Sequence, residues 1–165
     1  MDDRLPDLCD NHPDAVRWLP IQWQDFGAVS GFEGRIRTVR CYHDNSKVKA
    51  LLATPGQGQV LVVDGGGAMD RALLGDMIGK SAVDNGWAGV VIAAPVRDVA
   101  TLATLPIGIK ALGVCPIKTQ KRDWGEVDVV LTLEGVLVTP GDYLYADKNG
   151  VLVCAQPLST ISDVD

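Results

Sequence analysis

The sequence lacks any long apolar segment. No apolar run reaches the roughly 18 residues that a helix needs to span a bilayer. The N-terminal segment, MDDRLPDLCDNHPD, is acidic and contains no apolar stretch of the kind found in secretory signal peptides. From these two absences we expect a soluble, cytoplasmic protein with no membrane partner.

Cysteine is scarce, and no two cysteines lie close together in the chain. The four cysteines are Cys9, Cys41, Cys115 and Cys154. They include no CxxC pair, and neither histidine lies at a zinc-ligand spacing from any of them. This pattern argues against a structural zinc site and a disulfide framework, and it favours free thiols in a reducing compartment.

Basic residues form no strong cluster. The chain has a formal net charge of -6 and a pI of about 4.8. Nucleic-acid-binding proteins usually present a basic patch. The best candidate, KTQKR at residues 118–122, is followed by Asp123 and Glu126 and indicates a solvated loop. We therefore expect no direct contact with nucleic acid, although charge leaves binding to another protein open.

Apolar material is sufficient for a core. Hydrophobic residues make up 47% of the 165 residues, and charged residues make up 22%. A chain of this length suits one domain. No tandem repeat, low-complexity tract or long linker divides it, so we expect a single domain over residues 1–165.

The N-terminal third predicts a helix, a strand and a second helix. Residues 6–19 carry apolar side chains at a loose helical spacing after Pro6-Asp7. Alternation in FEGRIRTVRCY predicts a strand over residues 32–42. Asn45 or Ser46 is suited to cap a helix over KVKALLA.

The middle of the chain predicts a parallel βαβαβ unit. The apolar run 60–63 indicates a buried strand, which ends at Asp64 and three glycines. A helical stripe follows and should stop near Asn85-Gly86. The stripe consists of Leu73, Leu74, Met77, Ile78 and Ala82. The remaining elements are a strand over 88–94, a helix over 98–105 and a strand over 107–113. Right-handed crossovers are expected between the strands.

The C-terminal part changes in character from Val127 onward. It is rich in β-branched residues, with turn signals at Glu134-Gly135, Pro140-Gly141 and Asn149-Gly150. This spacing predicts a set of antiparallel strands.

Topology predicts that three polar segments share one edge of the parallel sheet. A helix that follows a strand starts at the carboxyl edge of the sheet, and the next parallel strand ends at that same edge. Open α/β sheets bind ligands outside this edge. Gly65 to Gly67, Gly75-Asp76 and Arg97-Asp98 should therefore lie on one rim.

The chemistry of this rim suits a small oxyanion and a metal. A helix that begins near Gly75 offers the backbone amides of its first turn to a carboxylate or phosphate. These amides belong to Gly75, Asp76, Met77 and Ile78. Arg97 can bind a carboxylate or keto acid with two hydrogen bonds. Asp98 is a hard oxygen ligand suited to Mg²⁺ or Mn²⁺.

Structural explanations compete with this interpretation. Asp76 near a helix start is most often a cap, and an Arg-Asp pair after a strand is most often a surface ion pair. Three glycines after a strand most often form a tight turn. The segment GGGAMDRALLGD contains no phosphate-binding P-loop signature, and no acidic residue is well placed to bind the ribose of a dinucleotide.

The same segments resemble the RraA-like family. The resemblance rests on VLVVDGGG, ALLGDMI, IGIKALG and PGDYLYADKNGV, and on the twenty residues between Asp76 and Arg97-Asp98. It runs from about Leu8 to Val153. The family contains regulators of ribonuclease E activity and class II 4-hydroxy-4-methyl-2-oxoglutarate aldolases. The resemblance implies an α/β fold, namely an α/β/β/α sandwich of swivelling-domain type, and a homotrimer with sites near subunit interfaces.

The resemblance also implies a lyase that depends on a divalent metal, Mg²⁺ or Mn²⁺, and acts on pyruvate-derived 2-oxo acids. By position, the amides from Gly75 to Ile78 hold the pyruvyl carboxylate. Arg97 binds the same unit and stabilises the enolate oxygen. Asp98 binds the metal, partly through water, and Asp76 orients the water that protonates the enolate. The expected activities are aldol cleavage and oxaloacetate decarboxylation.

One position departs from the aldolase pattern. The aldolases usually carry an acidic residue three positions after the Arg-Asp aspartate, and here that residue is Thr101. The alternative function is a protein regulator that binds ribonuclease E and inhibits RNA processing. Members of that group tend to lose the Gly-Asp and Arg-Asp pairs, and this chain keeps both. A methyltransferase function finds no support, because no suitable glycine loop follows the first strand.

Overall fold

A nine-stranded mixed sheet organises the chain. The computed structural model describes residues 3–158, with strand order β1-β11-β10-β3-β4-β5-β6-β2 and with β7 paired to β3. A two-stranded hairpin joins β8 to β9. The strands are β1 Arg17–Trp18, β2 Gln24–Asp25, β3 Phe32–Arg40, β4 Val60–Asp64, β5 Gly89–Val96, β6 Gly108–Val114, β7 Glu126–Val127, β8 Leu131–Leu133, β9 Val136–Val138, β10 Tyr143–Asp147 and β11 Gly150–Cys154. The helices are α1 Arg4–Asn11, α2 Ser46–Leu52, α3 Asp76–Asp84 and α4 Val99–Leu102.

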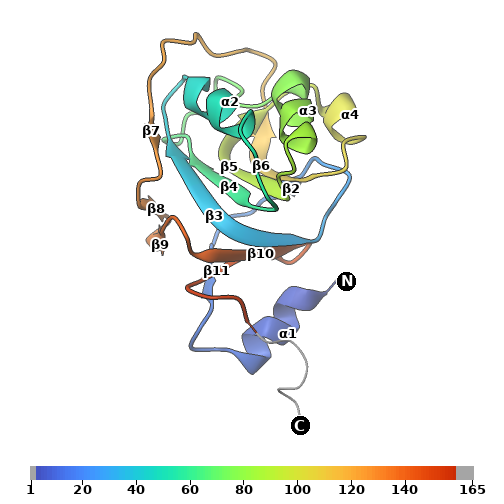
Figure 1. The fold of residues 1–165 in the computed structure, drawn as a ribbon, viewed down its shortest axis with the longest axis vertical. Helices are drawn as coiled ribbons and strands as arrows, with labels where there is room; N and C mark the ends of the chain where they lie inside the picture. The colour runs from blue at the N-terminus through green and yellow to red at the C-terminus, as the bar shows by residue number, and fades with distance from the viewer. Residues whose placement is uncertain (1–2, 159–165) are drawn as a thin grey trace.

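Strand β3 joins an antiparallel half of the sheet to a parallel half. Its first part pairs antiparallel with β10, with Arg35 opposite Tyr143. Its last part pairs parallel with β4, with Ile36 opposite Val60. Helices α2, α3 and α4 lie beyond the parallel half, and α1 lies beyond the antiparallel half (Figure 1). The expected α/β/β/α sandwich is confirmed.

Successive side chains of β4 point alternately into two separate hydrophobic cores. Leu61 and Val63 pack toward the helices, in a cluster with Ile78 of α3. Val60 and Val62 pack on the opposite face, in a cluster that includes Leu144 of β10. All four of these side chains are fully buried, which explains why residues 60–63 are a continuous apolar run.

The parallel unit contains one more strand than the sequence predicts. Strands β4, β5 and β6 pair in parallel through α3 and α4, which confirms the βαβαβ prediction. Strand β3 also pairs in parallel with β4, through α2. The carboxyl ends of four strands therefore lie along one edge of the sheet.

The N-terminal helix is shorter than predicted. Helix α1 ends at Asn11, whereas the sequence predicts a helix to residue 19. Pro13 follows closely, and the residue before a proline is disfavoured in helical geometry. His12 accordingly has φ -134° and ψ 54°. The chain then turns, and Trp18 pairs with Leu152 in the sheet.

The predicted stripe around α3 is partly wrong. Leu73 and Leu74 are buried but precede the helix, because this segment is extended and bonds to the end of β5. Met77 is 78% exposed rather than packed. The start after Gly75 and the stop at Asn85 are confirmed, and Gly86 adopts the expected positive φ of 78°.

The C-terminal antiparallel strands are confirmed. Glu134 and Gly135 turn the β8–β9 hairpin, both with positive φ. Strands β10 and β11 pair antiparallel around a turn at residues 148–149. None of the helices within residues 3–158 combines the length and the apolar character that crossing a membrane would require.

Candidate active site

The two charged ends of the β4–α3–β5 crossover meet at the carboxyl edge of the sheet. Leu74 forms a parallel bridge with Val96, and its carbonyl accepts a hydrogen bond of 2.9 Å from the Arg97 amide. The Asp76 amide then donates a hydrogen bond of 3.0 Å to Asp98 Oδ2. Backbone pairing thus fixes Asp76 beside Arg97 and Asp98, as topology predicts.

Glycine is required where the two segments touch. A Cβ atom on Gly75 would lie 2.5 Å from Asp98 Oδ2 and 3.3 Å from Arg97 Cγ. Real Cβ atoms essentially never lie 2.5 Å from another atom, so any larger residue would displace the Asp98 carboxylate. Asp98 itself is held in the left-handed region, with φ 58° and ψ 41°. Such strain is concentrated at functional sites in proteins.

Two backbone amides in the first turn of α3 are unpaired within the described residues. The Asp76 amide is already bonded to Asp98, so it is not free for a ligand. Within residues 3–158, the amides of Met77 and Ile78 have no hydrogen-bond acceptor. Together with the amide of Gly75, they give the helix N-terminus a local positive potential that suits a carboxylate.

The donor set at Asp98 fits a water-rich magnesium site. The hydrogen bond from Asp76 and the 3.9 Å ion pair with Arg97 Nε both fall on Oδ2. The Asp98 side chain is 38% exposed, so its other oxygen can reach solvent. Among the described residues there is no group of three or more His, Cys, Asp or Glu side chains that could hold a metal. Mg²⁺ needs only one or two protein carboxylates, because it keeps several waters.

These groups line one hollow of about 120 Å³. All the predicted site residues lie in it: Gly75, Asp76, Met77, Ile78, Arg97 and Asp98. The other lining residues are Asn45, Lys49, Ala72, Leu74, Lys118 and Lys121. The hollow therefore unites segments that follow four different strands of the parallel sheet, β3, β4, β5 and β6.

Sequence reasoning missed the three lysines of this hollow. Lys49 comes from α2, and Lys118 and Lys121 come from the segment between β6 and β7, here called the strap (residues 115–125). Partial burial lowers the pKa of Lys121, as do the nearby positive charges of Lys49, Lys118 and Arg97. The strap follows the carboxyl end of the parallel strand β6, and this position in the sequence is the signal that places Lys118 and Lys121 near the site.

Buried hydrogen bonds hold the strap against the site. Thr119 Oγ1 donates to Asn45 Oδ1 at 2.7 Å, and Asn45 Nδ2 donates to the Leu73 carbonyl at 2.9 Å. The Ala72 amide donates to the Ile117 carbonyl at 2.8 Å. Both Asn45 and Thr119 are buried, so this network fixes the backbone on either side of Lys118.

Asp44 anchors the far end of the strap. Its carboxylate, 3% exposed, accepts the Ser46 amide at 2.9 Å and the amides of Arg122 and Trp124 at 2.7 and 3.2 Å. Burial opposes the charge, but these hydrogen bonds together hold the Asp44 pKa below its ordinary value of 3.8. The ionised form therefore stabilises the native state.

Asp44→Asn is expected to lower the free energy of unfolding by about 1–2 kcal/mol at neutral pH, because charge-assisted hydrogen bonds are lost. The depressed pKa contributes stability above the unfolded-state pKa, and this contribution is lost as pH falls through the folded-state pKa. The gap from wild type should therefore shrink below about pH 4 in urea titrations. Asp14→Asn, at an exposed aspartate, is the matched control; a pH-independent gap would contradict this account.

Two predicted neighbours lie outside the hollow. Gly66 is on the same sheet edge, where its amide donates to Asp64 Oδ1 at 2.8 Å, but it faces Tyr42 in a separate depression. Thr101 donates its amide to the Asp98 carbonyl at 3.0 Å in the first turn of α4. Neither Thr101 nor any of the three glycines lines the hollow, and Gly66 and Gly67 form a turn with positive φ.

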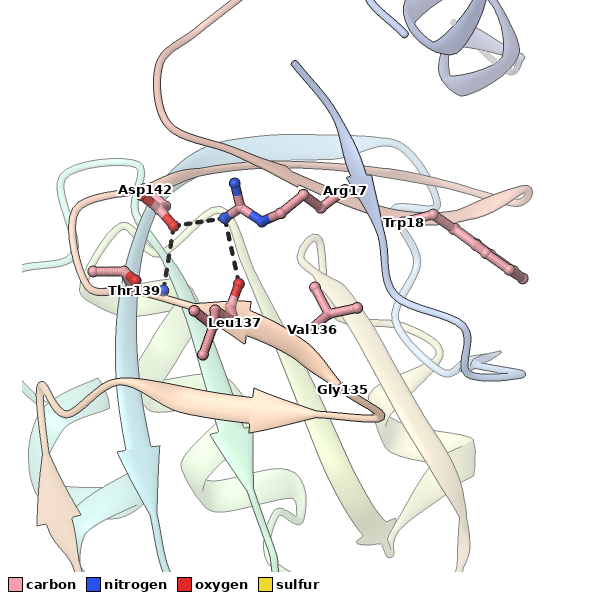
Figure 2. Close-up of a pocket in the computed structure, with 7 residues that line it drawn as sticks. All are labelled: Arg17, Trp18, Gly135, Val136, Leu137, Thr139 and Asp142. Atoms are coloured by element: carbon pink, nitrogen blue, oxygen red, sulfur yellow. Dashed lines mark hydrogen bonds and ion pairs between the residues drawn. The ribbon is translucent and has the colours of Figure 1, made fainter. Parts of the chain in front are cut away.

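A larger hollow of about 660 Å³ lies on another face of the molecule. Figure 2 shows it between β1 and the β8–β9 hairpin, with Trp18 and Val136 at one side. Arg17 there is paired with Asp142 at 2.9 Å and with the Leu137 carbonyl at 3.3 Å. None of the predicted site residues reaches this hollow, and the charges that line it are paired, so the smaller hollow is the better candidate.

The chain matches a known protein family over most of its length. A family model described as Aldolase/RraA, of the RraA-like family, matches residues 5–153. A Xanthomonas campestris protein provisionally named 4-hydroxy-4-methyl-2-oxoglutarate aldolase is 53% identical over 154 residues, which cover 93% of this chain and 92% of that protein.

Two solved structures share the fold closely. The RNA-processing inhibitor RraA from Thermus thermophilis is 44% identical, with a TM-score of 0.93 and 98% of each chain covered. A Geobacillus kaustophilus protein titled S-adenosylmethionine:2-dimethylmenaquinone methyltransferase is 42% identical, with a TM-score of 0.91, and the match covers 93% of this chain and 96% of that one. The likeness therefore extends over nearly the whole chain.

Proposed function

This chain belongs to the RraA-like family, whose members include aldolases and RNA-processing regulators, and we propose that it is a metal-dependent lyase. Its proposed reactions are cleavage of 4-hydroxy-4-methyl-2-oxoglutarate to pyruvate and decarboxylation of oxaloacetate. The observation that carries the proposal is the hydrogen bond from Asp76 to Asp98, which holds an Arg-Asp pair beside unpaired amides of α3.

The pyruvyl half of the substrate occupies the helix end of the hollow. Its carboxylate accepts hydrogen bonds from the amides of Gly75, Met77 and Ile78. The guanidinium of Arg97 lies beside Gly75, with Nε 3.4 Å from where a Cβ would stand. From there Arg97 donates to the 2-oxo oxygen, where negative charge develops. Charge-assisted hydrogen bonds of this kind stabilise an oxyanion more strongly as its charge grows.

Asp98 would hold the divalent cation, Mg²⁺ or Mn²⁺, which when bound supplies Lewis-acid stabilisation of charge on the substrate oxygen. The protein fixes the position of the carboxylate that would hold this cation. The Asp76 amide donates a hydrogen bond to Asp98, and Gly75 leaves room for the Asp98 carboxylate beside it.

Both reactions pass through a pyruvate enolate. In decarboxylation the C3–C4 bond of oxaloacetate breaks, CO₂ leaves, and the electron pair moves to the enolate. In aldol cleavage the C4 hydroxyl loses its proton, the C3–C4 bond breaks, and one pyruvate leaves as the other forms the enolate. A water oriented by the Asp76 carboxylate then gives a proton to C3 of the enolate, which becomes pyruvate.

The two reactions make different demands on the site. Aldol cleavage needs a base for the hydroxyl proton, whereas decarboxylation needs none. Thr101 cannot act as a base, and it lies outside the hollow. Decarboxylation is therefore the reaction with which to test the site.

The test measures pyruvate release from oxaloacetate by the purified protein with Mg²⁺ or Mn²⁺. A coupled lactate dehydrogenase assay monitors the pyruvate. We expect release well above the rate with metal alone, and loss of that excess when EDTA is added. A rate no higher than that with metal alone would refute the proposed lyase.

The proposed assembly is a homotrimer with the sites near subunit interfaces. Two apolar side chains beside the site support a protein contact there: Met77 is 78% exposed and Ile117 is 50% exposed. Sedimentation velocity should give the mass of three chains, and a single monomeric species would contradict this assembly.

A second candidate function is regulation of a ribonuclease such as ribonuclease E. The close fold match to an RNA-processing inhibitor favours it. The net charge of -6 suits docking to a basic RNA-binding partner. This function does not depend on Asp98 chemistry, so an Asp98 variant should still bind. A pull-down that finds no association with the ribonuclease at low salt would count against it.

A further inference from the structure

Two exposed aromatic side chains line a part of the surface that the proposed lyase site does not use. Tyr42 comes after β3 and is 49% exposed, and Trp124 lies near the end of the strap and is 60% exposed. Both rings line the same two depressions, of about 350 and 550 Å³. Large aromatic rings that remain open to solvent in a depression are typical of binding surfaces, because a ligand that covers them is stabilised by contact with the ring faces.

The Tyr42 ring is held in place although it is half exposed. It lies so close to the backbone of Gly66 that a Cβ atom there would be 2.8 Å from Tyr42 Cδ1. The His43 ring lies beside it, with 4.2 Å between the ring centroids, and His43 Nε2 is 2.5 Å from Asp70 Oδ1. A ring that is already held in position loses little conformational entropy when a ligand binds to it.

Asp44 positions the two strap residues that face this part of the surface. The Arg122 and Trp124 amides donate to Asp44 Oδ2 at 2.7 and 3.2 Å. These hydrogen bonds are made by the backbone, so the guanidinium and the indole ring stay available to a ligand. Substitution of either side chain also leaves the anchor of the strap intact.

Two arginines supply positive charge to the larger depression. It is lined by Arg71 and Arg122, and within residues 3–158 neither forms an ion pair with a carboxylate. Arg71 Nη1 donates to the Asp70 carbonyl and Arg122 Nη2 to Gln120 Oε1, both at 2.7 Å. The Asp44 carboxylate, which also lines the depression, is occupied by backbone amides. The remaining guanidinium donors suit a phosphate group.

Exposed acidic residues border the site and limit the length of the anion that it can hold. Asp70 lies next to Arg71, Asp123 lies between Arg122 and Trp124, and Glu126 lines the smaller depression. A polynucleotide needs basic side chains along its whole path. These carboxylates would repel further phosphates, so the charge pattern favours a single nucleotide.

We propose that this surface binds a nucleotide, with the base stacked on Trp124 and Tyr42 and the phosphate bound by Arg71 and Arg122. Nucleobases stack on aromatic side chains whatever their sequence, because every base has a flat π-face. None of these four residues lines the hollow of the proposed lyase. The inference therefore does not rest on the proposed function, and the two can fail separately.

The test measures the binding of adenosine monophosphate, adenosine and ribose 5-phosphate by calorimetry without divalent metal. Base and phosphate each contribute, so wild type should bind the nucleotide at least about tenfold more tightly than either part. Trp124→Leu should weaken nucleotide binding about tenfold and leave ribose 5-phosphate unchanged. Arg122→Gln should weaken the nucleotide and ribose 5-phosphate about tenfold and leave adenosine unchanged. Trp124→Phe, which keeps an aromatic ring, should retain most of the affinity.

Trp18→Leu and Arg35→Gln are the matched controls, because both residues are exposed on the antiparallel half of the sheet. Both controls should bind the nucleotide as wild type does, and all variants should keep the wild-type Tm. The proposal is overturned if wild type does not bind the nucleotide, or if the site variants bind it as tightly as wild type. An RNA of six adenylates that binds more than about tenfold tighter than the nucleotide would identify an RNA contact instead. Loss of assembly in Trp124→Leu, seen by sedimentation velocity, would identify a contact between copies of the chain and would equally overturn the proposal.

Discussion

Asp98→Asn is expected to reduce pyruvate release from oxaloacetate by about 1,000-fold, because the variant loses the only carboxylate proposed to hold the metal. Asparagine is chosen because it keeps the fold. Its side-chain oxygen can still accept the Asp76 amide, and asparagine tolerates the left-handed backbone found at this position. The variant therefore removes the charge and leaves the geometry.

The matched control for this variant is Asp84→Asn. Asp84 is exposed at the other end of α3, so the substitution makes the same change in net charge away from the site. Activity should be unchanged in the control, and both variants should keep the wild-type Tm. An Asp98→Asn protein that retains full metal-dependent activity would exclude Asp98 as the metal ligand.

Arg97→Lys is expected to lower kcat/KM for oxaloacetate by about 100-fold, even though the positive charge remains. Lysine cannot present two parallel N–H donors to an oxyanion, and its shorter donor group is not held beside Gly75 in the same way. The expected loss is that of one preorganised oxyanion donor. The pH dependence and the metal requirement should stay the same, because Asp98 is untouched.

Arg37→Lys is the control for Arg97→Lys. Arg37 forms a bidentate pair with Asp128, at 2.8 and 2.7 Å, outside the hollow. Breaking that pair should leave kcat/KM at the wild-type value. Equal activity in the Arg97→Lys and wild-type proteins would show that Arg97 supplies charge alone, and would contradict the bidentate role.

Sequence predicted the meeting of Asp76 with Arg97-Asp98 because that juxtaposition follows from topology. A parallel crossover must leave and return at one sheet edge, whatever the details of packing. The hydrogen bond from the Asp76 amide to the Asp98 carboxylate forms because this rule brings the two segments together. The glycine at position 75 was also correctly placed at the start of α3.

The helix stripe was partly wrong because helical spacing alone cannot tell a helix from an extended buried segment. Leu73 and Leu74 bury their side chains while their backbone bonds to the end of β5. This pairing is non-local, and no periodicity within residues 72–82 could predict it. Met77 sits at the helix start, where its side chain faces outward from the core.

The lysines were missed for a different reason. The composition of KTQKR and its acidic neighbours indicate only a solvated loop. The topological rule also applies to the segment after β6, the third strand of the predicted βαβαβ unit. Applied there, the rule places Lys118 and Lys121 on the same sheet edge. Lys49 had no such signal, because its direction depends on how α2 packs. The buried Asn45–Thr119 bond joins residues too far apart for local pattern reasoning.

Exchange of the pyruvate methyl protons, followed by ¹H NMR in D₂O, tests most directly whether this hollow forms a pyruvate enolate. It requires no aldol base and no second carboxylate, so it isolates the groups between Gly75 and Asp98. With Mg²⁺, wild-type protein should exchange the methyl protons faster than Mg²⁺ alone, and Asp98→Asn should not. Exchange no faster than with Mg²⁺ alone would contradict the proposed enolate chemistry.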